Sequence, residues 1–391
     1  MFTLLRGGKV YAPDALGKVD VLIAGEKIAY LAPQIEPPSG VGPIDVVDVT
    51  DRLIGPGLID QHVHLTGGGG EGGFVSRTPE VVLSRVTRAG ITTVVGCLGV
   101  DGTTRSMAGL LAKARGLEDE GISTYIYTGA YEVPTRTITG SVRSDLVLID
   151  KVIGAGEIAI SDHRSAQPSR EEIRKLAAEC RVGGMLGGKA GVLHLHVGNG
   201  KNGLGMLFEI VEESDIPISQ FVPTHVNRDP VLFESAVRWG RQGGIIDITS
   251  GVNPDSGTGV GIKPSRAIRL ALEKGVSIEN ISMSSDGNGS VPRFDERGRL
   301  QSLLVASPDS LCREFRDLVR LEGIALPEAL KVVTATVAKI LRLFPHKGAI
   351  AVGSDADLVV FDQELAIDQV WAKGRLMVRE GKPIVRGTFE E

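Results

Sequence analysis

The sequence of 391 residues is short of cysteine and of positive charge, and each shortage excludes a class of protein. Its three cysteines, Cys97, Cys180 and Cys312, are odd in number and far apart, so they imply no disulfide framework. The 48 aspartates and glutamates outnumber the 43 lysines and arginines. This balance argues against a nucleic-acid-binding protein, which needs a concentrated basic face.

Long hydrophobic runs are also missing. No stretch approaches the ~18 uninterrupted apolar residues that a membrane-spanning helix needs. The first residues meet charge and two glycines before the core of a signal peptide could form. We therefore expect a cytoplasmic protein that binds neither nucleic acid nor membrane.

In the middle of the chain, short apolar runs alternate with helical patterns. The apolar runs cover residues 58–64, 92–97, 124–131, 152–159, 191–197, 220–225, 244–248 and 281–286. The clearest helical patterns cover residues 79–89, 170–181, 230–241 and 264–272. In the first of them Thr78 is the expected N-cap and Pro79 the first helical residue. Strand–helix alternation predicts an α/β fold, and eight repeats predict a (β/α)₈ TIM-type barrel over residues 57–345.

Both ends of the chain carry short strand-like runs separated by proline, glycine and aspartate. They lie at residues 10–11, 19–23, 27–31, 46–49, 356–361, 369–371 and 373–378. Neither end is long enough to bury a core by itself. We expect residues 1–56 and 346–391 to form together one small β-sandwich domain beside the barrel.

The strongest local signal is the segment GPGLIDQHVH at residues 55–64. Alternate residues of a strand share a face, so His62 and His64 project the same way. At the carboxyl end of a barrel strand they point into the mouth, where such enzymes keep their sites. Two imidazoles at this spacing suit zinc or a similar divalent metal. Taken alone, the pair could equally be two packed or surface histidines.

The positions of other histidines in the chain favour a metal site over packed or surface histidines. His194 and His196 occupy the fifth apolar run and His225 ends the sixth, while Asp286 ends the eighth. Carboxyl ends of barrel strands meet at one mouth, so histidines after runs one, five and six and an aspartate after run eight predict a single metal site.

These residues sit in segments that resemble the amidohydrolase superfamily, and the isoaspartyl (β-aspartyl) dipeptidases most of all. The segments are HLTGGGGE at 64–71, TGAY at 128–131, SDHRS at 161–165, PTHVNR at 223–228 and SDGNGS at 285–290. The segment GAIAVGSDADL at 348–358 resembles the return of the superfamily chain into its small β domain. The resemblance covers nearly the whole chain.

The resemblance implies two divalent metal ions, most simply Zn²⁺, bridged by hydroxide. The implied ligands of the more buried ion are His62 and His64 with Asp286, and those of the second are His196 and His225. The superfamily usually bridges its metals with a carboxylated lysine, and here Glu157 stands in that position. Glutamate also ends in two oxygens, so we expect Glu157 to bridge; the alternative is a loop acid beside a mononuclear or rearranged site. His194 is expected to lie behind the ligands.

The implied activity is hydrolysis of β-aspartyl dipeptides, with Asp286 as general base and then general acid and Tyr131 at the oxyanion. Glu71 would pair with the substrate ammonium, and the backbone of Gly69 would contact the substrate. Its carboxylates would be received by Arg164, Arg228 and Ser290. Val100 departs from the family pattern, which tends to place a threonine there. The expected partners are a small dipeptide and further copies of this chain in a homo-oligomer.

Other amidohydrolase activities remain open. The rivals are a cyclic amidase of the dihydroorotase or hydantoinase type, an N-acyl-amino-acid deacylase, and a non-catalytic scaffold of the same fold. Glu71 discriminates among the enzymes, because a free ammonium needs a carboxylate partner and a cyclic amide does not. A scaffold would be expected to lose histidine ligands, and this sequence keeps them.

Overall fold

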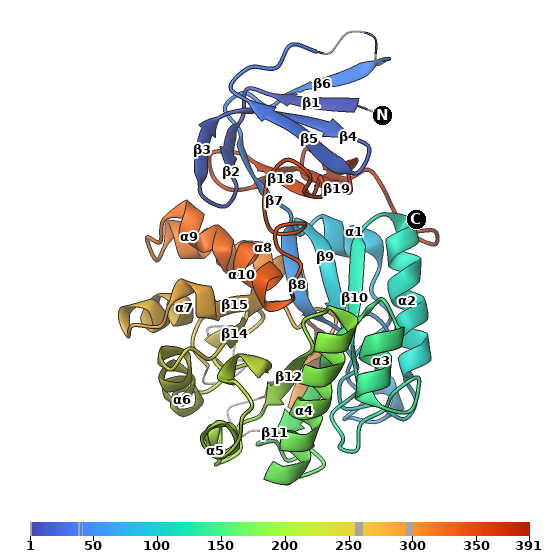
Figure 1. Ribbon diagram of the computed structural model, residues 1–391, viewed down its shortest axis with the longest axis vertical. Helices are drawn as coiled ribbons and strands as arrows, with labels where there is room; N and C mark the ends of the chain where they lie inside the picture. The colour runs from blue at the N-terminus through green and yellow to red at the C-terminus, as the bar shows by residue number, and fades with distance from the viewer. Residues whose placement is uncertain (1, 38–39, 41, 255–260, 295–299) are drawn as a thin grey trace.

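The computed structural model describes residues 2–37, 40, 42–254, 261–294 and 300–391. Figure 1 shows two parts: β strands from both chain ends at the top, and a larger α/β part below. None of the helices in the described residues has the length and apolar character needed to cross a membrane.

The larger part is built on a curled parallel sheet. Six strands pair in the order β13-β12-β11-β10-β9-β8, and β14 pairs with β15. Strand β14 lies beside β13, and β15 lies beside β8, where Val63 and Gly287 form a parallel bridge. The strands are β8 (Leu58–Val63), β9 (Ile91–Gly96), β10 (Ser123–Thr128), β11 (Val152–Ile160), β12 (Val192–Val197), β13 (Phe221–Thr224), β14 (Ile246–Thr249) and β15 (Ile281–Ser284).

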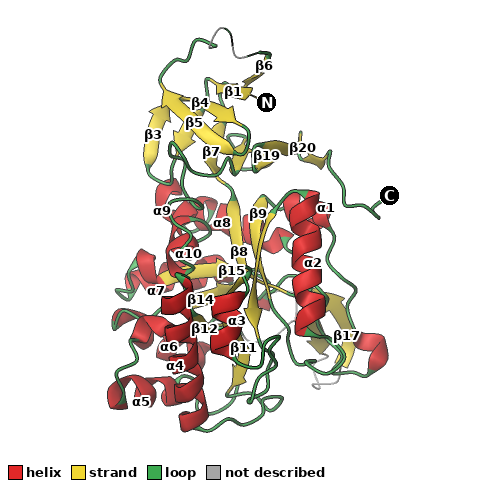
Figure 2. Ribbon diagram, turned by 45° about the vertical axis from the view of Figure 1, so that its right-hand side comes forward, coloured by secondary structure: helices red, strands yellow, loops and turns green. Residues whose placement is uncertain are grey.

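Helices lie around the outside of these strands (Figure 2). They are α1 (Leu83–Thr87), α2 (Met107–Glu120), α3 (Val142–Leu148), α4 (Arg170–Gly187), α5 (Gly205–Glu213), α6 (Pro230–Arg241), α7 (Pro264–Glu273), α8 (Asp309–Arg320), α9 (Leu326–Lys331) and α10 (Ala335–Ile340). Short 3₁₀ turns are η1 (Phe74–Ser76), η2 (Ile218–Gln220) and η4 (Ile278–Asn280). A hairpin of β16 (Ser290–Phe294) and β17 (Leu300–Val305) follows β15. One large hydrophobic cluster joins sheet and helices, so the fully buried strands carry the core.

Three of the four predicted helices begin where expected. Helix α4 begins at Arg170 behind a capping box of Ser169 and Glu172, but it runs on to Gly187. Helices α6 and α7 begin at Pro230 and Pro264, each with proline in the first turn.

The first predicted helix was wrong at its start. Helix α1 covers only Leu83–Thr87, and its N-cap is Val82 rather than Thr78. The Thr78 hydroxyl instead accepts a hydrogen bond from the Gly68 N–H at 2.7 Å and donates to the Asn288 carbonyl at 2.7 Å. These tertiary contacts hold residues 78–81 in an extended loop, so the local helix signal is overridden.

Strands from the two ends of the chain form two further sheets. The first contains N-terminal strands, and the second combines strands from both ends. One has the order β5-β4-β1-β6, from β1 (Phe2–Arg6), β4 (Asp20–Ala24), β5 (Lys27–Ala32) and β6 (Ile44–Asp48). The other has the order β21-β20-β19-β18-β7-β2-β3, from β2 (Lys9–Tyr11), β3 (Ala15–Lys18), β7 (Leu53–Pro56), β18 (Leu358–Phe361), β19 (Ile367–Ala372), β20 (Arg375–Arg379) and β21 (Lys382–Pro383). One hydrophobic cluster joins residues of both sheets, including Leu5, Val21, Ile54, Leu358 and Trp371.

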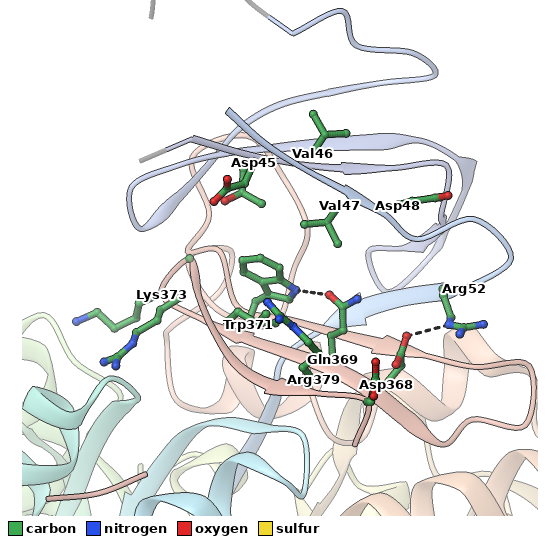
Figure 3. Close-up of a pocket in the computed structure, with 15 residues that line it drawn as sticks. Asp45, Val46, Val47, Asp48, Arg52, Asp368, Gln369, Trp371, Lys373 and Arg379 are labelled. Atoms are coloured by element: carbon green, nitrogen blue, oxygen red, sulfur yellow. Dashed lines mark hydrogen bonds and ion pairs between the residues drawn. The ribbon is translucent and has the colours of Figure 1, made fainter. Parts of the chain in front are cut away.

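An open cavity of about 920 Å³ lies between these terminal sheets (Figure 3). Its lining includes Asp45 and Val47 of β6 and Trp371 of β19. Trp371 is held by a hydrogen bond from its Nε1 to Gln369 Oε1 at 3.1 Å. None of the lining residues is a histidine or one of the acids expected to bind metal, so the cavity is separate from the site described next.

Candidate active site

Five histidines and two acids converge at the carboxyl ends of the parallel strands. His62 lies on strand β8 and His64 directly follows it, while β12 supplies His194 and His196. His225 follows β13 with a φ of +63°, and Asp286 follows β15 with a φ of +53°. Non-glycine residues rarely adopt positive φ, and such backbone positions cluster at functional sites because surrounding structure must hold them. The fold thus brings together the residues that the strand spacing predicted.

Glu157, on β11, lies at the centre of this group and is 1% exposed. Its Oε2 lies 3.1 Å from His196 Nδ1, 3.4 Å from His62 Nε2 and 3.5 Å from His225 Nε2. Its Oε1 lies 3.4 Å from His64 Nε2. The carboxylate therefore faces both pairs of histidines at once.

Two glycines that precede Glu157 on β11 make this approach possible. A Cβ on Gly154 would lie 2.6 Å from the carbonyl oxygen of Val192, and one on Gly156 would lie 2.7 Å from that of His194. Both contacts are to backbone of the neighbouring strand β12, which cannot move aside without breaking the sheet. Larger residues would therefore push β11, and Glu157 with it, away from the histidines.

The ligand atoms fall into two groups that share Glu157. One group is His62, His64, Cys97 and Glu157, and the other is Glu157, His196 and His225. Within each group, one nitrogen, oxygen or sulfur atom per residue lies within 4.8 Å of all the others. His62 Nε2 is fully buried and finds no hydrogen-bond partner among the described residues. A buried, unpaired nitrogen aimed at a carboxylate and a set of imidazole and carboxylate donors both fit a divalent cation.

The two acids are ionised in this setting. Burial by itself raises the pKa of Glu157, but His62 and the hydrogen bonds of His196 and His225 lower it well below its usual range. Burial also opposes ionisation of Asp286, but the hydrogen bond with His64 at 3.1 Å and the charges of His225, His62 and His64 together outweigh it and lower that pKa. Ionised carboxylates are the form that binds metal.

The expected substrate-binding residues surround His196. Arg164 Nη1 donates to Glu71 Oε1 at 2.9 Å, and Arg228 Nη1 lies 3.2 Å from His196 Nε2. Tyr131 OH lies 2.7 Å from His196 Nδ1. The structure thus gathers one carboxylate, two guanidinium groups and a phenol beside the histidines.

Gly69, Ser290 and Val100 lie at the edge of the same region. A Cβ on Gly69 would come within 3.0 Å of the Ser290 side chain, and Gly69 has a φ of +71°, which favours glycine. Val100 is partly buried and follows Gly99, whose Cα faces His64 and Glu157. Among the described residues, no contact assigns Val100 a role.

Two residues of this cluster are not among those predicted from the sequence. Cys97 is buried at the end of β9, and its Sγ lies 3.9 Å from His64 Nδ1. The strand-end rule that found the histidines would also have found Cys97. Asp162 accepts hydrogen bonds from the backbone and guanidinium of Arg164 and lies 2.9 Å from His196 Nε2. It stands in the segment SDHRS, where only the arginine was chosen.

Of the seven histidines, His163, His194 and His346 lie outside the ligand groups. His194 Nε2 lies 2.8 Å from His62 Nδ1, and its ring stacks on Tyr127, so it supports His62 from behind. The His163 side chain is 91% exposed, and its Nδ1 lies 3.6 Å from Asp162 Oδ1.

Comparisons with known proteins agree with this geometry. The sequence profile of the amidohydrolase family matches residues 259–377. A β-aspartyl dipeptidase from thermophilic, keratin-degrading Fervidobacterium islandicum AW-1, crystallised in complex with a β-Asp-Leu dipeptide, is 45% identical over 98% of both chains, with a TM-score of 0.89. The chain belongs to the β-aspartyl dipeptidase family of the amidohydrolases. It is therefore a hydrolase.

More distant relatives share the fold of this amidohydrolase or a short stretch of its sequence. A dihydropyrimidinase from Brevibacillus agri NCHU1002 is 19% identical over 99% of this chain and 97% of its own, with a TM-score of 0.70. A dihydroorotase from Staphylococcus aureus (strain N315) is 40% identical over 91 residues, which are 23% of this chain. That match spans only 20% of the length of the dihydroorotase.

Proposed function

We propose that this amidohydrolase hydrolyses β-aspartyl dipeptides with the help of two divalent cations. The observation that carries the proposal is the charge pattern around His196, where Glu71, Arg164 and Arg228 converge. A β-aspartyl dipeptide carries one ammonium and two carboxylates, so this pattern is its complement. The similarity to a β-aspartyl dipeptidase crystallised with β-Asp-Leu supports the same substrate class.

The two ligand groups would hold the cations. His62 and His64, assisted by Asp286, would bind one; His196 and His225 would bind the other, and Glu157 would bridge them. Imidazole and carboxylate donors in closed clusters favour zinc. When bound, the cations would polarise the scissile carbonyl and lower the pKa of the attacking water.

Protein groups would then move the protons and hold the developing charge. Asp286, the most exposed of the acids at the centre, would take the proton of the attacking water and return it to the leaving amine. Tyr131 would donate a hydrogen bond to the developing oxyanion. Burial, and then Glu157, raise the pKa of Tyr131 well above its usual range, so its hydroxyl keeps the proton that it must donate.

Substrate would replace an ion pair that already exists within the protein. Arg164 and Glu71 are paired with each other at 2.9 Å. A dipeptide would give its ammonium to Glu71 and a carboxylate to Arg164, so neither charged group is left without a partner. Arg228 and Ser290 would take the remaining carboxylate oxygens, and the backbone of Gly69 would contact the substrate.

The architecture supports this arrangement at a larger scale. We propose that β8 to β15 close into a (β/α)₈ barrel over residues 57–345 and that the active site occupies its mouth. Residues 1–56 and 346–391 would form the separate β-sandwich domain, and copies of the chain would associate into a homo-oligomer. The hydrophobic cluster shared by the two terminal sheets supports the sandwich.

A cyclic amidase is the second candidate, because the local identity to dihydroorotases and dihydropyrimidinases favours it. A cyclic amide has no free ammonium, so Glu71 would have no partner in that reaction. The residue therefore separates the two candidates.

The test compares substrates side by side on zinc-loaded protein. We expect hydrolysis of β-Asp-Leu and none of α-Asp-Leu, dihydroorotate or hydantoin. The variant Glu71→Gln should raise KM for β-Asp-Leu by at least about tenfold, since a hydrogen bond to a charged group contributes about 1.5–3 kcal/mol. Cleavage of a cyclic amide with Glu71→Gln as active as wild type would instead establish the cyclic amidase.

A further inference from the structure

Cys97 occupies a position that the proposed chemistry has not used. It follows β9 directly, and its N–H donates to the Val63 carbonyl at 3.1 Å, which fixes it beside the end of β8. The side chain is fully buried, and its Sγ lies 3.8 Å from that same carbonyl and 3.9 Å from His64 Nδ1. The strand pairing therefore delivers a sulfur atom to the histidine pair of β8.

The sulfur atom belongs to the ligand cluster by distance. One atom each from His62, His64, Cys97 and Glu157 lies within 4.8 Å of the other three. Two donors of a tetrahedral zinc ion lie about 3.3–3.8 Å apart, because the metal–ligand bonds are about 2.0–2.3 Å long. The four donors, all within 4.8 Å of one another, thus lie near this spacing, and a bound cation would draw them together.

The other two cysteines are placed very differently. Cys180 lies inside helix α4 and Cys312 inside helix α8, and neither belongs to a metal-binding cluster among the described residues. Proximity of sulfur to the histidines is therefore particular to Cys97, and the chain itself supplies two control thiols.

We propose that Cys97 is a sulfur ligand of the cation held by His62 and His64. The two cations then occupy unlike donor sets. One has two nitrogens, the shared Glu157 carboxylate, the assisting Asp286 carboxylate and a sulfur, and the other has two nitrogens and the shared carboxylate. Thiolate donors favour zinc and softer ions over magnesium and manganese. The first position is therefore the more selective of the two, while the second keeps room for water and substrate. This inference rests on the proposed metal centre but not on the substrate.

The alternative is that Cys97 only fills space. It also contacts the cluster formed by Ile59, Val95 and Tyr127 in the interior of the curled sheet, where a free cysteine acts as a small apolar side chain. A space-filling role and a ligand role predict different spectra.

The experiment uses the full chain loaded with Co²⁺, because a cobalt–thiolate bond gives an intense near-ultraviolet charge-transfer band that nitrogen and oxygen ligands do not give. The double variant Cys180→Ser, Cys312→Ser keeps Cys97 as its single thiol and needs no change at the site. We expect the band in wild type and in the double variant, rising with one of the two equivalents of bound Co²⁺. We expect it to be lost in Cys97→Ser.

A calorimetric titration with Zn²⁺ gives a second readout. Cys97→Ser and Cys97→Ala should weaken one of the two binding steps by at least about tenfold, since even the loss of a partner behind a ligand has that effect. Cys180→Ser should leave both steps unchanged, and circular dichroism checks that each variant is folded.

The outcomes separate this inference from the proposed function. A double variant that binds cobalt without the near-ultraviolet band overturns the sulfur ligand and leaves the metal centre standing. Zinc affinities in Cys97→Ser within twofold of wild type also overturn it. A wild-type protein that binds no cobalt and no zinc overturns both proposals.

Discussion

Tyr131 shows how the surroundings of one side chain fix its chemistry. Its hydroxyl is buried 2.7 Å from His196 Nδ1, and its raised pKa keeps it protonated across the working pH range. We expect Tyr131→Phe to lower kcat for β-Asp-Leu about 100-fold, the usual cost of removing one oxyanion donor, with metal content unchanged. Steady-state kinetics and metal analysis of the purified variant check this.

Tyr127 is the matched control for that variant. It is fully buried on β10, and its hydroxyl finds no partner among the described residues. Removing an unpaired buried hydroxyl is close to neutral, so Tyr127→Phe should keep its kcat and its stability. A Tyr131→Phe enzyme as active as Tyr127→Phe would show that the phenol has no part in the reaction.

At the scale of single residues, most members of the metal-ligand cluster can be predicted from the sequence, but some cannot. His62, His64 and His196 were found because side chains alternate along a strand and barrel strands end at one mouth. Glu157 was found through resemblance alone. Asp162 was missed because its role depends on a guanidinium and an imidazole that only the folded chain brings to it.

At the scale of elements, strands were predicted better than helix starts. Each of the eight predicted apolar runs overlaps an observed strand, because fully buried parallel strands are continuous apolar runs. Helix α1 was misplaced because the hydrogen bonds of Thr78 reach Gly68 and Asn288, which no local pattern reveals. Strand β1 was not predicted, and it is recognisable only from its pairing with β4 and β6.

Strand β11 gives a prediction at this scale, because it must approach β12 closely to deliver Glu157. Gly156 has a φ of +155°, and an added Cβ would meet the His194 backbone at 2.7 Å. We expect Gly156→Ala to lower the free energy of unfolding by about 1–3 kcal/mol and to weaken zinc binding as Glu157 is displaced. Urea denaturation and calorimetric zinc titration measure the two effects.

A second glycine-to-alanine change has the opposite expected sign. Gly116 lies inside helix α2, and an added Cβ there would meet nothing within 4 Å. Alanine is about 0.8–1 kcal/mol better than glycine in a helix interior, so Gly116→Ala should stabilise the protein and leave zinc binding unchanged. If Gly156→Ala also stabilised the protein and left zinc binding unchanged, the close approach of β11 to β12 would be needed neither for stability nor for the metal site.

For the whole molecule, the metal centre connects strands that lie far apart in the sequence. Its ligand groups draw on β8, β11, β12 and the segments after β9 and β13. A ligand that binds only the folded state stabilises it by about 4 kcal/mol at 1,000 times its Kd. Chelation should therefore lower Tm by several degrees, and added zinc should restore it, as measured by scanning calorimetry. An unchanged Tm after removal of all metal would contradict a structural contribution from the centre.

Lys347 connects the α/β part with the terminal sheets, and its environment makes stability depend on pH. The ammonium is 4% exposed and lies 2.5 Å from Asp357 and 2.7 Å from Asp355, while it also reaches Ser123 at the start of β10. Burial by itself raises the pKa of Asp355, but Lys347 and Lys27 lower it below the usual 3.8. The ionised Asp355 carboxylate thus stabilises the folded protein above pH 4, and this stabilisation is lost as the pH falls through its lowered pKa.

We expect Lys347→Met to lower the free energy of unfolding at pH 7 by about 3–5 kcal/mol, because it takes the ion-pair partner from the buried Asp357 and leaves Asp355 with Lys27 alone. In the variant Asp355 takes up its proton at higher pH than in wild type, so the difference in the free energy of unfolding between the two proteins should narrow from pH 7 to pH 4. Lys27→Met removes a half-exposed partner of the same Asp355 and should cost less than about 1 kcal/mol. Urea denaturation of the three proteins at pH 7 and pH 4 measures these free energies of unfolding. If the difference between wild type and Lys347→Met stayed constant with pH, Lys347 would stabilise the contact between the α/β part and the terminal sheets by packing and not by charge.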